Sequence, residues 1–180
     1  RRVKETDGNV SIPNVEGNTN FVIKYGHLST GNLLGNNVID VKYGDFKSRD
    51  MMGTKNNIDV KYGQINIQKL MGQQNIVTTS YGGMVSIGQT NTLEIDIKYS
   101  RLKINIADVL LVESGYSNTT IGKVKKLRVN SKYENYSIGE VDDLNAYFGY
   151  GNVSIGKLGK SLTISEIKYG KLDVDYVSPD

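Results

Sequence analysis

The sequence contains no cysteine and no tryptophan, and only 2 of its 180 residues are proline. Without cysteine the chain has no disulfide, no zinc–thiolate site and no thiol nucleophile. No run of about 18 consecutive apolar residues occurs, which excludes a transmembrane helix and predicts no direct insertion into a membrane. The first residues, Arg1–Asp7, hold no apolar signal core, so we expect any export signal or anchor to lie upstream of residue 1.

The net charge is also small, because 22 basic residues nearly balance 19 acidic ones and leave a formal net charge of +3. A nucleic-acid-binding domain needs a concentrated basic face, so this balance predicts no nucleic-acid partner. The chain has a single histidine, His27. One histidine and no cysteine offer little to a transition metal, and we predict no metal and no other cofactor.

Tyrosine and glycine are plentiful, and the tyrosines are regularly spaced. The tripeptide Lys-Tyr-Gly occurs four times, and 9 of the 12 tyrosines follow one another at intervals of 17 to 19 residues. Regular spacing of this length is the mark of a repeat architecture. The nine are predicted to form a structural ladder: Tyr25, Tyr43, Tyr62, Tyr81, Tyr99, Tyr116, Tyr133, Tyr150 and Tyr169.

Each repeat reads as two short strands around a glycine corner. Positions four and two before the tyrosine are mostly apolar, as in Ile58 and Val60 before Tyr62, while the positions between them are polar. This period-two alternation is typical of a half-buried strand, and it predicts that the tyrosine ring faces inward. A second strand carries apolar residues three and five positions after the tyrosine. In the fourth repeat an extra glycine, in Gly82-Gly83, indicates a bulge that shifts this pattern by one residue.

The repeats predict an all-β, single-domain β-solenoid of about nine to ten rungs, each of about 18 residues with two strands. Residues 1–180 form this one domain, with a partial first rung at 1–15 and tyrosine-centred repeats from about 18 to 177. A hairpin meander is the alternative, but identical columns of Tyr, Ile and Gly favour direct stacking of parallel rungs. We expect a right-handed coil. Charge and proline at the two ends indicate protected edges: Arg1, Arg2, Lys4, Glu5, Asp173, Asp175, Pro179 and Asp180.

Few residues point to chemistry. We interpret His27 as an exposed corner residue rather than a general base. An acidic column precedes the tyrosines but alternates with lysines, which predicts a solvated, charge-balanced face rather than a calcium or paired-carboxylate site. Three Asn-x-Ser/Thr sequons recur because the repeat recurs. The sequence therefore predicts no catalytic, cofactor-binding or metal-binding residue. The acidic column is Asp40, Asp59, Asp96, Glu113 and Glu166.

Two segments carry a resemblance to a known group of proteins. Residues 58–67 and 152–158 resemble the adhesin-type β-solenoid families of exported bacterial proteins, which include the toastrack-like domains and the head domain named for autotransporter adhesins, common in Bacteroidetes. The resemblance covers nearly the whole chain. It implies a right-handed solenoid, export to the periplasm or cell surface, and no established catalytic residues.

Two functions remain open on this basis. The first is a non-catalytic binding or scaffold module of the cell envelope, an adhesin that would bind a glycan or an envelope protein. The second is a carbohydrate-active β-helix enzyme, such as a polysaccharide lyase or hydrolase, to which Asp96, Lys98 and Arg101 would contribute. End-to-end stacking of rungs would also allow self-association.

Overall fold

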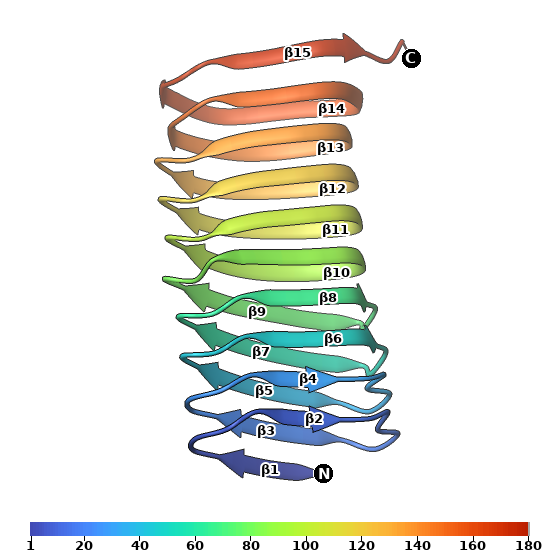
Figure 1. Ribbon diagram of the computed structural model, residues 1–180. Helices are drawn as coiled ribbons and strands as arrows, with labels where there is room; N and C mark the ends of the chain where they lie inside the picture. The colour runs from blue at the N-terminus through green and yellow to red at the C-terminus, as the bar shows by residue number, and fades with distance from the viewer. Residues whose placement is uncertain (180) are drawn as a thin grey trace.

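A computed structural model describes residues 1–179 and shows a β-solenoid, a coil of parallel strands stacked into a rod (Figure 1). The described residues contain strands, bends and irregular segments, and none forms a helix that is long and apolar enough to cross a membrane. Asp180, one of the expected edge-protecting residues, lies outside the described range.

The coil has two flat faces, and each tyrosine marks the corner between them. We call the face formed by residues before each tyrosine the first face and that formed by residues after it the second face. The first five first-face strands are β1 (Arg2–Glu5), β3 (Thr19–Ile23), β5 (Asn37–Lys42), β7 (Lys55–Lys61) and β9 (Gln74–Ser80). The separate second-face strands are β2 (Val10–Ile12), β4 (Leu28–Thr30), β6 (Phe46–Met51), β8 (Ile65–Leu70) and β15 (Leu172–Val177).

Later rungs lose the break at the far corner, so a single strand bends from the second face into the next first face. The first half of β10 pairs with β8, where Val85 lies opposite Ile65, and its second half pairs with β9, where Ile95 lies opposite Val77. These bent strands are β10 (Met84–Lys98), β11 (Arg101–Gly115), β12 (Asn118–Lys132), β13 (Asn135–Tyr150) and β14 (Val153–Tyr169).

All strand pairings among the described residues are parallel and join residues about one repeat apart, such as Ile39 with Ile58 and Ile121 with Ile138. A hairpin meander would pair antiparallel neighbours, so the solenoid prediction is confirmed. The slip in the fourth repeat is also confirmed, because Val85, not Met84, takes the buried position opposite Leu102. The extra glycine thus absorbs one residue at the corner and keeps the buried face in register.

The inner residues of both faces form one continuous hydrophobic core. The columns predicted to be apolar are buried, including Phe21 and Ile23 on the first face and Leu28 on the second. Burial of each large aliphatic side chain contributes about 1.5–3 kcal/mol, but only when a neighbouring rung covers it. The rod therefore folds as a stack rather than as independent repeats.

A ladder of buried polar side chains runs inside the far corner of the first rungs, and the sequence patterns above did not reveal it. Thr19 Oγ1 donates to Asn37 Oδ1 at 2.6 Å, Asn37 Nδ2 donates to Asn56 Oδ1 at 2.6 Å, and Asn56 Nδ2 donates to Asn75 Oδ1 at 2.8 Å. The amides also donate to corner carbonyls, such as Asn56 Nδ2 to Gly53 O at 3.1 Å. The ladder supplies hydrogen bonds to backbone carbonyls that have no partner in a neighbouring strand at this corner.

Candidate functional site

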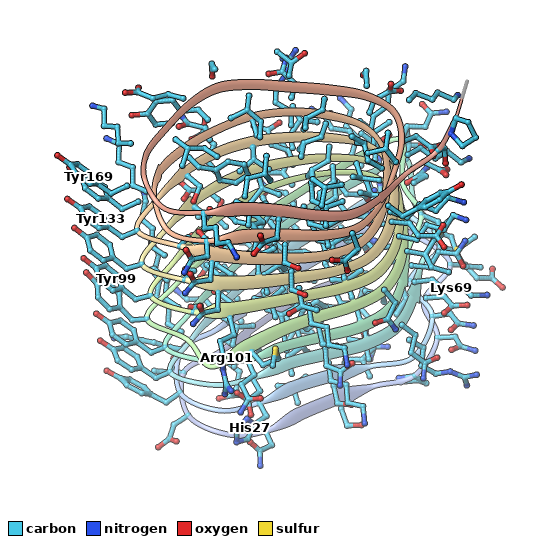
Figure 2. All side chains as sticks on the ribbon, turned by 90° about the horizontal axis from the view of Figure 1, so that it is seen from above. His27, Lys69, Tyr99, Arg101, Tyr133 and Tyr169 are labelled. Atoms are coloured by element: carbon cyan, nitrogen blue, oxygen red, sulfur yellow. The ribbon has the colours of Figure 1, made fainter. Side chains whose placement is uncertain are left out.

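The nine tyrosines form the most regular surface feature, and their rings face outward. Their exposed fractions run from 37% at Tyr150 to 70% at Tyr169. In the view along the rod, Tyr99, Tyr133 and Tyr169 project from one end of the flattened coil, opposite Lys69 (Figure 2). The predicted ladder exists, but the prediction that its rings face inward is wrong.

The cause of this correction is local backbone geometry at the corner. In most rungs the strand ends just before the tyrosine, so alternation no longer sets the direction of its side chain. Tyr43, for example, follows the last residue of β5. Six of the tyrosines adopt the left-handed region, with φ between 53° and 57°. At Tyr25 and Tyr150 the following glycine has the positive φ instead, 142° at Gly26 and 139° at Gly151.

Each ring stacks on the next, so the ladder is continuous along the rod. Ring centroids of successive tyrosines lie 4.6–5.5 Å apart, with interplanar angles of 3–17°. A left-handed φ destabilises a bulky residue by about 1–2 kcal/mol. Each stacked aromatic pair contributes about 0.5–1.5 kcal/mol beyond its burial and so offsets this strain. Because inner rings are covered on both faces, the ladder offers partners its ring edges and hydroxyls rather than open platforms for stacking.

Removing one inner ring should test this balance. Tyr99 contacts Tyr81 at 4.9 Å and Tyr116 at 5.1 Å. We expect Tyr99→Ala to lower the free energy of unfolding by about 1–3 kcal/mol, since two aromatic pairs are lost while the positive φ remains. Urea denaturation measures this change. Tyr169→Ala, at the end of the ladder with one stacked neighbour, should cost about half as much; an equal or larger cost at Tyr169 would contradict a cooperative ladder.

The acidic column lies on the first face beside lysines, as the charge pattern predicted. Three ion pairs join it to the lysines that precede the tyrosines: Lys61 with Asp59 at 3.6 Å, Lys98 with Asp96 at 3.4 Å and Lys168 with Glu166 at 3.8 Å. Within residues 1–179 no cluster of three or more acidic or histidine side chains could hold a metal ion.

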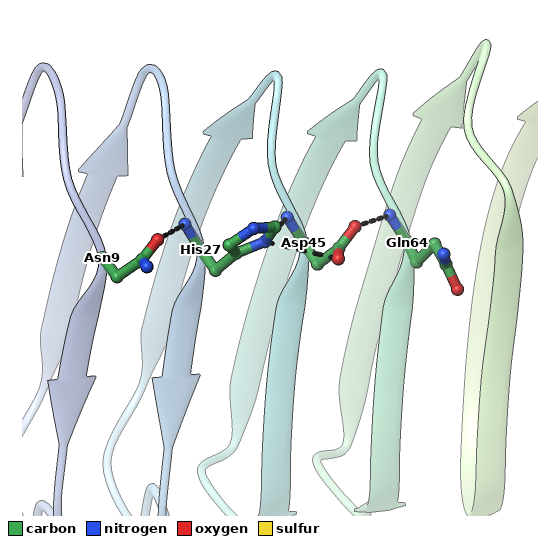
Figure 3. A network of polar contacts seen from close by, with 4 residues as sticks. All are labelled: Asn9, His27, Asp45 and Gln64. Atoms are coloured by element: carbon green, nitrogen blue, oxygen red, sulfur yellow. Dashed lines mark hydrogen bonds and ion pairs between the residues drawn. The ribbon is translucent and has the colours of Figure 1, made fainter.

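His27 is exposed at the tyrosine corner and belongs to a chain of hydrogen bonds between rungs (Figure 3). Asn9 Oδ1 accepts from the His27 N–H at 2.9 Å, His27 Nδ1 accepts from the Asp45 N–H at 3.1 Å, and Asp45 Oδ1 accepts from the Gln64 N–H at 2.8 Å. Each side chain thus satisfies an amide of the next rung. Asp45 Oδ2 also lies 3.3 Å from Nδ1, and a protonated ring would pair with this carboxylate instead.

The three residues that favoured an enzyme do not lie on one face. Asp96 and Lys98 are on the first-face half of β10, whereas Arg101 begins β11 on the second face, beyond the corner formed by Tyr99. Arg101 instead lines a hollow of about 400 Å³ together with Tyr99, Tyr116 and Asn118.

The second face next to this hollow carries a patch of uncharged polar side chains, which we call the corner shelf. Its members come from the three Asn-x-Ser/Thr segments and repeat once per rung. Together with the exposed carboxylate of Asp173 on the following rung, they line a hollow of about 450 Å³ that shares Asn118 with the hollow at Arg101. Amides and hydroxyls here can donate and accept hydrogen bonds. The corner shelf consists of Asn118, Thr120, Asn135, Ser137, Asn152 and Ser154.

A buried carboxyl lies behind the shelf, inside the coil. Glu134 takes the corner position that glycine holds in most rungs and is only 3% exposed. Its Oε1 accepts from Thr119 Oγ1 at 2.5 Å and its Oε2 from Ser131 Oγ at 3.3 Å. Burial raises the pKa of Glu134 above its ordinary value, although these hydroxyls partly oppose the shift. Burial and the neighbouring Glu134 also raise the pKa of Tyr136, whose hydroxyl lies 2.6 Å from Ser114 Oγ.

The raised pKa of Glu134 predicts a pH-dependent stability. A carboxyl whose pKa is higher in the folded state binds protons more readily there, so its contribution to stability is complete below the unfolded pKa of about 4.3 and is lost as pH rises through the folded pKa. Glu134→Gln removes this dependence. We therefore expect the difference in free energy of unfolding between the variant and the parent to grow in favour of the variant from pH 4 to pH 7, measured by urea denaturation.

Glu140→Gln is the matched control, because the hydrogen bond and charge of Lys123 lower the pKa of the exposed Glu140 carboxyl. Stability linked to a lowered pKa is present above the unfolded pKa and is lost as pH falls, so this control should show the opposite trend. Parallel pH profiles for the two variants would contradict the assignment at Glu134.

No family model matches the chain, and no curated protein or solved structure matches it either.

Proposed function

We propose that the chain is a non-catalytic module that binds a glycan at the bacterial cell surface through the corner shelf. The observation that carries this proposal is a pair of hollows along the tyrosine corner that share Asn118, one of which is lined mainly by amides and hydroxyls of three successive rungs. Sugar hydroxyls both donate and accept hydrogen bonds, as these side chains do.

The geometry favours an extended ligand that runs along the rod. Shelf side chains repeat at the spacing of parallel strands, about 4.8 Å, and Arg101 and the edges of Tyr99 and Tyr116 extend the surface beyond Asn118. Export to the cell surface rests on the resemblance to adhesin-type solenoids. A regular rod would present its corner to a partner over many rungs, as a scaffold or adhesin requires.

A glycan array probed with the purified chain tests the proposal. We expect binding to polymeric glycans and, for a non-catalytic module, no change in their chain length after incubation. The triple variant Thr120→Val, Ser137→Ala, Ser154→Ala should weaken binding by roughly tenfold or more, because three exposed hydroxyls are lost.

Ser29→Ala is the control, since Ser29 is an exposed hydroxyl of the same second-face column, several rungs away from the shelf. It should bind like the parent chain. Absence of any bound glycan, or equal binding by the triple variant, would refute the proposal. Shortened glycan chains would instead support the enzyme alternative.

A further inference from the structure

A third hollow, larger than the two along the tyrosine corner, lies on the first face of the last rungs. It has a volume of about 510 Å³ and extends across β11, β12, β13 and β14. Val109 and Leu111 line it on one rung, Lys126 and Arg128 on the next, and Asn145 on the following one. The hollow therefore combines a small apolar patch, two cations, the carboxylate of Asp143 and polar groups within a few rungs.

The regular stacking of the rod is interrupted beside this hollow. Among the strand pairings of residues 1–179, register shifts occur only between β13 and β14, at Val141/Asp143 and at Ala146/Tyr147. The two shifts bracket the segment that pairs Asp143 with Ser161 and Asn145 with Thr163, all of which line the hollow. Bulges are enriched next to functional sites, where they redirect side chains, so this local irregularity marks the hollow independently of its shape.

The two cations of the hollow differ from Lys123 and Lys125 of the same strand. Lys123 pairs with Glu140 at 3.0 Å and Lys125 pairs with Asp108 at 2.7 Å. By contrast, no ion pair within the described part of the chain involves Lys126 or Arg128. Asp143, opposite Lys126 in the register, accepts a hydrogen bond from Ser161 Oγ at 2.8 Å. The surface thus retains two cationic groups, two residues apart on one strand, that are free to meet an anion.

We infer that this hollow is a second binding site, which takes an anionic saccharide. Arg128 and Lys126 hold the carboxylate or sulfate, since a guanidinium matches the geometry of both groups with paired donors. Leu111 and Val109 contact the apolar C–H face of a sugar ring, and Asn145 and Thr163 bind its hydroxyls. This site lies on the first face, whereas the corner shelf lies on the second, so it stands whether or not the shelf binds a glycan.

Calorimetric titration of the full chain tests the inference with three probes: tetragalacturonate, its fully methyl-esterified form and a sulfated galactan tetrasaccharide. We expect one or both anionic probes to bind and the neutral ester to bind at least roughly tenfold more weakly, with affinity falling as salt is added. Binding of tetragalacturonate alone assigns the anion as a carboxylate, and binding of the sulfated probe alone assigns it as a sulfate. Binding of neither overturns the inference.

Variants then locate the site. Lys126→Gln and Arg128→Gln should each weaken binding of the anionic probe by roughly tenfold, the loss typical of one charge-assisted hydrogen bond. Both side chains are exposed, so neither variant should unfold the chain. Lys47→Gln, at an exposed lysine of the second face several rungs from both candidate sites, is the charge-matched control and should leave the affinity unchanged. If both Lys126→Gln and Arg128→Gln bound the anionic probe as tightly as the parent chain, the inference would be overturned.

Discussion

Replacing Asn56 with Asp should be among the most destabilising single-atom changes in this protein. Asn56 is 1% exposed, and its Nδ2 donates to Gly53 O and to Asn75 Oδ1. In the Asn56→Asp variant a carboxylate oxygen replaces Nδ2 and faces two acceptors, the Gly53 carbonyl oxygen and Asn75 Oδ1. The variant also buries a negative charge that has no cationic partner. We expect a loss of about 3–5 kcal/mol in the free energy of unfolding at pH 7. Urea denaturation followed by circular dichroism measures it.

The neighbouring residue provides the matched control for this prediction. Asn57 carries the same amide on the exposed side of β7, so Asn57→Asp should change stability by less than about 0.5 kcal/mol. Burial also raises the pKa of a carboxyl, so the loss in Asn56→Asp should shrink as pH falls and the acid becomes neutral. Equal effects of the two substitutions would show that the polar ladder adds nothing to the fold.

A second large effect is expected at the glycine of the tyrosine corner. A Cβ on Gly63 would lie 1.8 Å from the carbonyl oxygen of Gly44 in the rung below, and a backbone atom cannot rotate away. Gly63→Ala must therefore separate two rungs or distort the corner. We expect the free energy of unfolding to fall by about 3 kcal/mol, at the upper end of the usual cost of overpacking. Thermal unfolding should show a correspondingly lower midpoint.

Gly115→Ala distinguishes this clash from a general effect of glycine. Its Cβ would meet no atom closer than the Lys132 carbonyl oxygen at 4.0 Å, and its φ is not positive. The variant should be within about 1 kcal/mol of the parent chain, or slightly more stable because its unfolded state is less flexible. If Gly63→Ala were as stable as Gly115→Ala, close stacking at the corner would not limit the residue type there.

The corner column also shows that the need for glycine is local. Ser100, Ser117 and Glu134 occupy the same column in later rungs, where Ser100 Oγ accepts from the Gly82 N–H at 3.0 Å. Backbone geometry at the corner differs from rung to rung. The recurrence of glycine in the sequence does not show in which rungs the geometry excludes a side chain. The tripeptide Lys-Tyr-Gly therefore identifies the corner, but it does not reveal the close approach of the Gly44 carbonyl oxygen that restricts position 63 to glycine.

The polar ladder has a signal in the sequence. Asn37, Asn56 and Asn75 recur at intervals of 19 residues, six positions before their tyrosines, in the phase that alternation assigns to the core. A polar residue that recurs in a buried phase predicts a hydrogen-bonded column. Glu134 carried no such signal, because it occurs once and at a position otherwise read as a corner.

The sequence by itself determined the repeat, the two strands of each rung, the buried columns and the one-residue slip at Gly82-Gly83. These features follow from local alternation and from the fact that a one-residue slip would expose a whole strand face. Only the tertiary structure decided the direction of the tyrosine rings and the location of the two candidate sites. Ring direction depends on the φ angle at the corner, where alternation ends. The sites depend on which residues of successive rungs lie side by side. The 19-residue interval from Tyr150 to Tyr169 shows that two extra residues are present, but only the structure places the two register shifts between β13 and β14 that absorb them.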